Sequence, residues 1–424
     1  MMFSTRSKRN LTLFVVAFAG LAVLAAAAWL FLGNRLEFGK PSFTPLGKMH
    51  TLGSQSLLKV TFSDTQSGLA KTEILLTQDG KTHSLSTMTY PPGRYRTHTV
   101  EVLLDPAKLG LHEGPATLRL SARDSALISN AATREHPVMI DFGPPQIFLL
   151  STQNHVNPGG TCVIAYRLSE PAALTGVLVD QAFFKAYPMM LAGKPSFLCY
   201  FAMPMENAGK MVGIRIFARD QGGNQSSATV PYQLMNKTFR SDKMMLSDAF
   251  LQQKMPEFQM SLPQLRGKPL LDAFIYVNTL LRADNFKTIQ SLCTKTEPRQ
   301  LWSDTFLRMK NASPMAQFGD HRTYLYGGNS VGESVHMGVD LASTTQAPIE
   351  AANSGTVVYA RYFGIYGNAV IIDHGYGLQT IYGHLSSIAV KEGQQVARET
   401  VIGNTGETGL AGGDHLHYCT LLQG

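Results

Sequence analysis

The chain has 424 residues, which is enough for two to four domains, and 44% of them are hydrophobic. Its formal net charge is +7 and its pI is near 9.1. The basic residues are dispersed and form no patch interleaved with aromatic side chains, which argues against a nucleic-acid partner. We therefore expect a soluble basic surface rather than a nucleic-acid interface.

An uncharged, mostly apolar run covers residues 11–32 and follows a basic tail at residues 1–10. Its 22 residues suffice for the roughly 20 helical residues that span a bilayer core. A cleavable signal peptide has a shorter apolar core of about 7–15 residues and ends in small residues. Residues 25–28 are alanine and offer such an alternative, but the apolar run continues past them. We expect an uncleaved transmembrane helix with the tail in the cytoplasm and the remainder outside, because positive flanks stay inside.

Two β-rich modules, residues 49–143 and 144–238, are expected after a linker at 33–48. A segment that alternates apolar and polar residues and ends at Asp124 is echoed by one that ends at Asp220, 96 residues later. Each is followed by a polar turn, which is typical of a strand and its connection. The spacing is that of one immunoglobulin-like β-sandwich, so we predict two of them.

Four cysteines are distributed along the chain. Cys162 and Cys199 lie in the second module and are candidates for a disulfide in an oxidising compartment. Cys293 lies in a helical stretch. Cys419 is expected to pack beside the C-terminal histidines, because a fourth protein ligand would close a catalytic metal site.

The pattern becomes helical over residues 239–312. Apolar side chains follow an i, i+4, i+7, i+11 stripe from Leu270 to Leu281, with Pro269 at the first helical position. Ser247 is expected to cap a shorter helix that ends before Pro256. We expect a helical connector that packs on the C-terminal domain, with a lid or inhibitory segment over its cleft as the alternative.

Residues 313–424 carry a concentration of metal-binding side chains. These side chains are His336, Asp340, His384, His415 and His417. Zinc binds imidazole nitrogen and carboxylate oxygen, and a hydrolytic zinc keeps one position open for water. Two histidines and one aspartate would hold such an ion and leave the fourth position for the nucleophile.

The spacing of these residues is compatible with extended chain. Gly338 and the Val-Asp-Leu that follows argue against a helix between His336 and Asp340, and residues four apart in a strand share a face. His415 and His417, two apart, share a face in the same way. Short strands punctuated by glycine predict an antiparallel β domain with its site in a groove between loops.

Several short motifs accompany the histidines in a fixed order. They are Gly355-Thr-Val357, Tyr366-Gly-Asn368, Thr380-Ile-Tyr-Gly-His384, Gly393-Gln-Gln-Val396, Ile402-Gly403, Gly406-Glu-Thr-Gly409 and Gly413-Asp-His-Leu-His417. Together they make the chain from about Ala316 to its end resemble the lysostaphin (LytM-type) family of zinc peptidoglycan endopeptidases. The resemblance covers roughly a quarter of the chain.

The resemblance implies a role for each histidine of the set. His336, Asp340 and His417 would be the ligands of one Zn²⁺ per catalytic domain. His415 would be the general base or the imidazole that orients the water, and His384 would be its partner, which stabilises the oxyanion. His374 would not be a ligand. His321, which follows Phe318-Gly-Asp, is expected to be a strand-edge or loop residue beside the cleft. The chain ends seven residues after His417, whereas relatives continue with another strand, so the domain is expected to be truncated.

The expected protein is a mostly β, multidomain, zinc-dependent endopeptidase that hydrolyses peptide cross-links of peptidoglycan. It would be a single-pass protein of the inner membrane with its catalytic domain in the periplasm. Its partners would be peptidoglycan stem peptides, the membrane, and cell-wall machinery proteins that dock on the sandwiches. Two alternatives stay open, which are a non-catalytic scaffold or amidase activator and a protease that processes other proteins.

Overall fold

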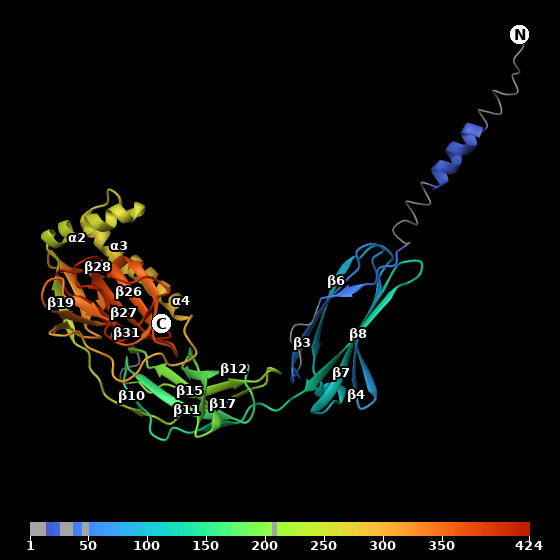
Figure 1. Cartoon of the computed structure of the whole chain (residues 1–424), viewed down its shortest axis with the longest axis horizontal. Coiled ribbons are helices and arrows are strands. Elements are labelled where there is room, and N and C mark those ends of the chain that lie inside the picture. Colours follow the sequence, from blue (N-terminus) through green and yellow to red (C-terminus); the bar gives the residue numbers. More distant parts are fainter. Residues whose placement is uncertain (1–13, 26–36, 45–50, 206–209) are drawn as a thin grey trace, which may run out of the picture. The chain divides into compact units, whose positions relative to one another are not determined.

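The computed structural model describes residues 14–25, 37–44, 51–205 and 210–424, which divide into two compact units (Figure 1). The first unit comprises the described residues up to 146 together with 170–174 and 218–226, and the second comprises the other described residues. Strands predominate among the described residues, which confirms the predicted mostly β class.

The predicted membrane anchor is described only at residues 14–25, which are helical. The rest of the anchor at 11–32 and the tail at 1–10 lie outside the described residues. Among the helices that the structure describes, none is long and apolar enough to cross a membrane. The anchor therefore stays a prediction.

In the first unit, a three-stranded sheet and a five-stranded sheet enclose one hydrophobic core. The elements are β1 Ser42–Phe43, β2 Thr51–Leu52, β3 Ser56–Ser63, β4 Leu69–Gln78, β5 Lys81–Thr89, β6 Thr97–Leu104, η1 Ala107–Leu109, β7 Gly114–Asp124 and β8 Ala131–Ile140. The sheet orders are β1-β3-β6 and β2-β8-β7-β4-β5. Alternate residues of β3, namely Leu58, Val60 and Phe62, are fully buried, as expected for a strand with one face in a core.

Two four-stranded sheets enclose a second core, with strand orders β14-β15-β11-β9 and β13-β12-β16-β17. The strands are β9 Ile147–Leu149, β10 His155–Val156, β11 Thr161–Leu168, β12 Leu174–Val179, β13 Ala182–Lys185, β14 Tyr187–Leu191, β15 Lys194–Ala202, β16 Ile214–Arg219, β17 Gln225–Thr229 and β18 Gln233–Leu234. Cys162 on β11 and Cys199 on β15 are both free thiols, so the candidate disulfide is not formed.

The predicted repeat has a physical basis in the two aspartates that follow matching strands. Asp124 ends β7, and its carboxylate accepts a 2.8 Å hydrogen bond from the Asn130 side chain. Asp220 follows β16, and its carboxylate accepts a 2.9 Å bond from the Asn224 side chain. Each pair closes the turn after its strand, which explains why both modules carry the same polar pattern there.

The helical segment begins with a strand that joins the C-terminal domain, because β19 pairs in parallel with β21 (His321–Tyr326). The elements are β19 Ser241–Met245, α2 Asp248–Ser261, η3 Pro263–Leu265, α3 Leu270–Tyr276, the π-helical turn η4 Val277–Leu281 and α4 Arg282–Cys293. Ser247 caps α2 as predicted, since its Oγ accepts from Phe250 N at 3.2 Å. The prediction that this helix ends before Pro256 is wrong, because α2 continues to Ser261.

The C-terminal domain contains a seven-stranded sheet in the order β20-β23-β31-β27-β26-β25-β29 and two three-stranded sheets, β19-β21-β22 and β24-β30-β28. The elements not yet given are β20 Ser313–Ala316, β22 Asn329–Val335, β23 Val339–Ala342, β24 Pro348–Glu350, β25 Gly355–Tyr362, η5 Gly364–Tyr366, β26 Asn368–Asp373, β27 Leu378–Leu385, β28 Ser387–Ile388, β29 Gln395–Val396, β30 Val401–Asn404 and β31 Leu416–Leu422. Residues 313–424 are all described, and η5 is the only helical element among them. This agrees with the predicted antiparallel β domain.

Candidate active site

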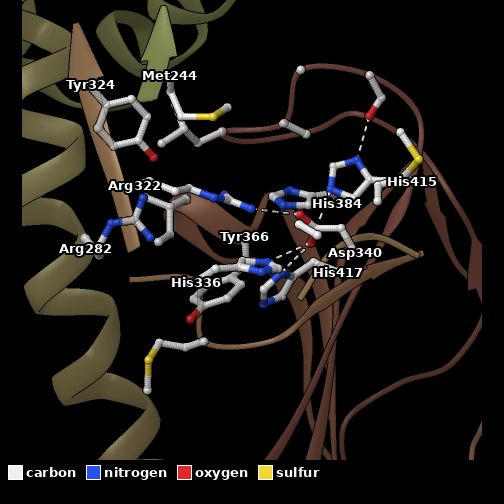
Figure 2. A pocket seen from close by; sticks show the side chains of 18 of the residues that line it. Met244, Arg282, Arg322, Tyr324, His336, Asp340, Tyr366, His384, His415 and His417 are labelled. Atoms are coloured by element: carbon white, nitrogen blue, oxygen red, sulfur yellow. Dashed lines mark hydrogen bonds and ion pairs between the residues drawn. The ribbon is translucent and has the colours of Figure 1, made fainter. Parts of the chain in front are cut away.

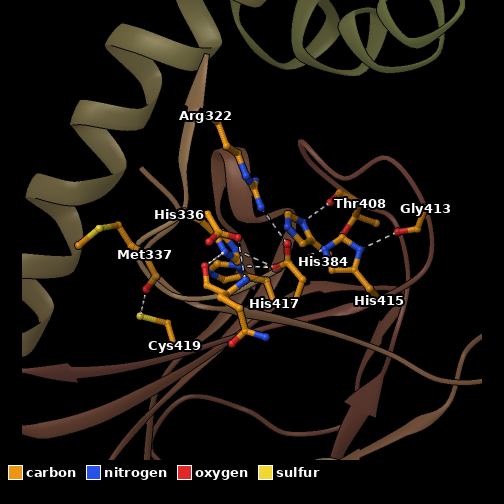
Figure 3. A network of polar contacts seen from close by, with 12 residues as sticks. Arg322, His336, Met337, His384, Thr408, Gly413, His415, His417 and Cys419 are labelled. Atoms are coloured by element: carbon orange, nitrogen blue, oxygen red, sulfur yellow. Dashed lines mark hydrogen bonds and ion pairs between the residues drawn. The ribbon is translucent and has the colours of Figure 1, made fainter. Parts of the chain in front are cut away.

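The side chains of His336, Asp340 and His417 meet where β22, β23 and β31 come together (Figure 2; Figure 3 shows the polar contacts around the two histidines). His336 Nε2 lies 2.9 Å from Asp340 Oδ1 and 3.1 Å from His417 Nδ1. His417 Nδ1 also lies 2.9 Å from the same Asp340 oxygen. Asp340 on β23 is paired directly with His417 on β31, so the strand register alone places two of the three side chains next to each other. The structure thus brings together the three residues predicted as ligands.

The chain between His336 and Asp340 differs from the predicted strand. β22 ends just before His336, the next residues bend, and β23 begins just before Asp340. Glycine is required at the bend, since a Cβ on Gly338 would lie 2.7 Å from the His417 ring and 2.6 Å from the Tyr418 carbonyl oxygen. The prediction of a continuous strand is wrong here, and the two ligands converge through a glycine bend instead.

The donor atoms of the three residues fit one metal ion. Separations of 2.9–3.1 Å allow each atom to lie about 2.0–2.2 Å from a common centre, the range zinc adopts with imidazole and carboxylate. His336 Nδ1 donates to the Gln317 carbonyl at 2.9 Å, which fixes the tautomer whose Nε2 lone pair is available to a metal. His417 presents Nδ1 to the centre, and its Nε2 is buried without a hydrogen-bond partner among the described residues.

The surroundings of the Asp340 carboxylate favour its ionised form. Burial raises the pKa of Asp340, but its contacts with His336, His415 and His417 outweigh burial and hold the pKa well below the ordinary value. An ionised carboxylate is the form that binds a metal cation.

Two further histidines flank the three candidate ligands. His384 Nδ1 donates to the Thr408 carbonyl at 2.9 Å, and His415 Nδ1 donates to the Gly413 carbonyl at 2.8 Å. Since each Nδ1 is committed to a carbonyl, each ring exchanges protons with the site only through Nε2. The two ring centroids are 4.9 Å apart, and His415 Nε2 lies 3.6 Å from the candidate ligand Asp340.

The backbone at these histidines is irregular. His384 lies in β27 but has a φ of +64°, a left-handed conformation that is uncommon for a residue other than glycine. His415 immediately precedes β31 and forms an isolated bridge with Gly406, so the predicted common strand holds His417 but not His415. Strained positions of this kind concentrate at functional sites.

The pKa values of the two flanking histidines are shifted in opposite directions. Burial, reinforced by His417 and His415, holds the pKa of His384 well below the ordinary imidazole value. Burial also lowers the pKa of His415, but the nearby Asp340 carboxylate outweighs it, so this pKa is raised. The two rings therefore differ in their affinity for a proton, as is common for paired acid and base groups.

A cleft of about 880 Å³ opens over the site (Figure 2). One side is lined by the C-terminal domain, and the other by β19 and the helical segment through residues that include Met244, Phe250 and Phe274. Arg322 of β21 reaches into the cleft, where its Nη2 lies 3.3 Å from Asp340 Oδ2.

The remaining histidines and cysteines near the motif do not join the site. His374 is fully buried and bonds to the Ser354 carbonyl and the Thr380 hydroxyl. His321 lies in β21 and is absent from the cleft lining. Cys419 Sγ donates to the Met337 carbonyl at 2.8 Å, which is a packing role. None of the three belongs to the cluster that His336, Asp340 and His417 form, and His321, which was expected beside the cleft, lies in a strand and does not line it.

Sequence reasoning missed the arginines of the cleft. Arg322 and Arg282 are isolated basic residues in a strand and a helix, and no motif signals them. Thr408 lies within a quoted motif, but its role as the acceptor for His384 depends on a backbone carbonyl, for which side-chain identity gives no signal.

The arrangement is suited to hydrolysis of a peptide bond. An ionised carboxylate and two imidazoles can hold a metal, and two further imidazoles offer Nε2 atoms for proton exchange beside it. The cleft is lined by residues of seven strands and three α-helices, as well as η4 and η5, and an opening bordered by so many elements suits an extended substrate.

The profile of Peptidase family M23 matches residues 334–424. The peptidoglycan DD-endopeptidase ShyA of Vibrio cholerae serotype O1 is 43% identical over 89 residues. The DD-carboxypeptidase/endopeptidase Mpg of Neisseria meningitidis serogroup B is 40% identical over 90 residues. Each alignment covers 21% of this chain and 21% of the relative, so the chain matches about one fifth of the length of these relatives.

The chain is also similar to solved structures over part of its length. The catalytic domain of lysostaphin from Staphylococcus simulans has 29% identity and a TM-score of 0.23, over 27% of this chain and 83% of that one. The catalytic domain of the prophage-encoded M23 protein EnpA from Enterococcus faecalis has 30% identity and a TM-score of 0.24, over 28% and 88%.

Proposed function

Because residues 334–424 form a Peptidase family M23 domain, we propose that this protein is a zinc-dependent endopeptidase that hydrolyses peptide cross-links of peptidoglycan. The observation that carries the proposal is the meeting of His336, Asp340 and His417 within hydrogen-bond distance of one another. The name of the relative ShyA, a peptidoglycan DD-endopeptidase, supports peptidoglycan as the substrate.

In this proposal His336 Nε2, Asp340 Oδ1 and His417 Nδ1 hold one zinc ion. When bound, zinc would polarise the scissile carbonyl and make a water molecule more acidic. His415 accepts the proton of the attacking water at Nε2, since its Nδ1 is held by a carbonyl. For His384 to donate to the developing oxyanion, its Nε2 must carry a second proton, because its Nδ1–H is committed to Thr408. The lowered pKa of this ring opposes that protonation, so the role requires the bound substrate to favour the protonated form.

We also propose that residues 11–32 anchor the protein in the cytoplasmic membrane with the catalytic domain outside. The support is the apolar run behind a basic tail. This location places the site on the side of the membrane where peptidoglycan lies. The two β-sandwiches would space the domain from the membrane or dock cell-wall proteins.

Digestion of purified sacculi tests the proposed function. The full chain should release peptide fragments in which a cross-link has been cut, identified by mass. Chelation should stop release and added zinc should restore it. The Asp340→Asn variant keeps the side-chain volume but loses the negative charge, so it should release at most a trace of these peptide fragments. A metal-loaded wild type that leaves sacculi intact would point to the scaffold alternative instead.

A further inference from the structure

Two arginine side chains enter the cleft beside the candidate metal centre (Figure 2). Arg322 comes from β21 and contacts Asp340, one of the proposed ligands, at 3.3 Å. Arg282 comes from the first turn of α4 and lies near Arg322 on the side of the cleft next to that helix. The carboxylates that line the same cleft are Asp340 and Asp414.

Arg282 is the less neutralised of the two guanidinium groups. Its Nε donates to the Asn278 carbonyl at 3.3 Å and its Nη2 donates to the Asn278 side-chain oxygen at 3.1 Å. In the part of the chain that the structure describes, it forms no ion pair with a carboxylate, whereas Arg322 does. Burial and the positive charge of Arg322 lower the pKa of Arg282, but a guanidinium stays charged at any physiological pH.

The helix presents Arg282 to the cleft by a specific local structure. The π-helical turn η4 ends immediately before Arg282, and such turns occur frequently at functional sites. Thr279, Arg282, Ala283 and Phe286 all line the cleft, at the i, i+3, i+4, i+7 spacing of one helix face. Arg282 is the only charged side chain on that face, so its charge is directed at whatever occupies the cleft.

Once the proposed metal ion is bound, the two carboxylates of the cleft do not neutralise both guanidinium charges. Asp340 is committed to the proposed metal through Oδ1, which leaves only Oδ2 to Arg322. Asp414 accepts from the Gln346 backbone N–H at 3.0 Å and pairs with neither arginine. A negatively charged group of the substrate would neutralise the positive charge that remains.

We propose that Arg282 and Arg322 form a subsite for a substrate carboxylate adjacent to the scissile amide, and that this subsite determines which peptide bonds are cut. The proposal rests on the proposed function. Guanidinium groups bind carboxylates through paired N–H donors, which gives both charge and geometric selection.

The position of the subsite indicates which carboxylate it takes. Because Arg322 touches a proposed metal ligand, a carboxylate held there lies next to the reacting amide. The nearest candidate on a peptide is the carboxylate on the carbon that bears the leaving nitrogen. A C-terminal residue has this group free, and so does a diamino-acid centre on the amine side of a cross-link.

The test compares matched substrates with a free or an amidated carboxylate at that carbon. One arm uses a stem peptide with a C-terminal D-alanyl-D-alanine, and the other uses a cross-linked dimer. For the full chain, amidation should lower kcat/KM roughly 10- to 100-fold in the arm whose carboxylate occupies the subsite, as expected for loss of a charged hydrogen-bond pair. The arm that shows this loss identifies the source of the carboxylate.

Arg282→Gln should lose a similar factor on the free-carboxylate substrate and be unchanged on the amidated one, while Arg282→Lys should recover part of the loss. Lys287→Gln is the matched control, since it removes one positive charge from the exposed face of the same helix and should match wild type. If amidation has no effect in either arm, or if Arg282→Gln slows both forms equally, the subsite does not exist.

A binding measurement separates this inference from the proposed function. Should zinc-loaded wild type cleave neither substrate, the proposed function fails, and calorimetric titration with D-alanyl-D-alanine and its amide decides the subsite. Tighter binding of the free acid by wild type, lost in Arg282→Gln, supports the subsite. Equal binding of the two compounds overturns it.

Discussion

Replacing Gly338 by alanine tests whether the bend between two proposed ligands controls the metal site. The added Cβ would lie 2.7 Å from His417 Cε1 and Nε2, whereas ordinary contacts begin at 3.4 Å. The ring would have to move by about 0.7 Å, several times the tolerance of about 0.2 Å for metal–ligand distances. The Tyr418 carbonyl, 2.6 Å from the same Cβ, cannot move without disturbing β31.

We therefore expect Gly338→Ala to weaken zinc binding by at least 10- to 100-fold, the effect of losing the support of a metal ligand. Overpacking should also lower the free energy of unfolding by about 1–3 kcal/mol. Chelator competition measures the affinity, and thermal unfolding with and without zinc measures the stability.

Gly213→Ala is the matched control, because its Cβ would meet nothing closer than 4.0 Å. It should behave as wild type in both assays. Unchanged zinc affinity in Gly338→Ala would refute the argument that this bend positions His417, and with it the explanation for the spacing of the two ligands.

Four further outcomes are expected. His336→Ala should lose most of its zinc in elemental analysis, because the remaining pair is a poor chelate; full occupancy would reject the ligand assignment. His415→Ala and His384→Ala should keep zinc and fold but lose turnover on sacculi by about 10²-fold or more, and near-normal cleavage by both would reject their roles. Lys254→Met should keep zinc but lower kcat, because the buried Lys254 ammonium binds a carbonyl of the loop that holds His384; an unchanged kcat would make that contact dispensable. A reporter fused after Gly424 should be active only outside the cytoplasm, and cytoplasmic activity would contradict the proposed anchor.

The sequence predicted which residues form the site more accurately than it predicted how they are arranged in space. Histidines and an aspartate are rare enough together that their identity and order indicate a metal centre. The bend at Gly338 is invisible to such reasoning, because glycine is needed there only on account of the His417 ring, which arrives from a strand almost 80 residues later. A strand and a bend both bring residues four apart together, so spacing alone could not distinguish them.

The arginines were missed for a related reason. Arg282 precedes the matched segment by about 50 residues, and its position in the cleft depends on how the helices pack. An isolated arginine in a helical sequence is ordinarily a solvent-exposed residue. The role proposed for Arg282 becomes apparent only when the structure shows that it lines the same cleft as Arg322 and the proposed metal ligands.

The continuation of α2 through Pro256 shows tertiary packing overriding a local rule. A proline inside a helix costs about 3 kcal/mol, because it removes one hydrogen bond and crowds the preceding turn. Met255 and Phe258 are both fully buried, and each contributes about 1.5–3 kcal/mol by leaving water. If the helix ended before the proline, Phe258 would lose its place in the core, so burial outweighs the cost of the proline.

The same burial bears on whether the helical segment is a removable lid. Phe258, Phe274 and Val277 are fully buried in one cluster that also includes Tyr324 of β21 and Ile365 of η5. Lifting the helices from the cleft would expose these side chains at about 1.5–3 kcal/mol each, which approaches the whole stability of a typical domain. The packing therefore favours a fixed wall, and a fixed wall can hold Arg282 in the constant position that a specificity subsite requires.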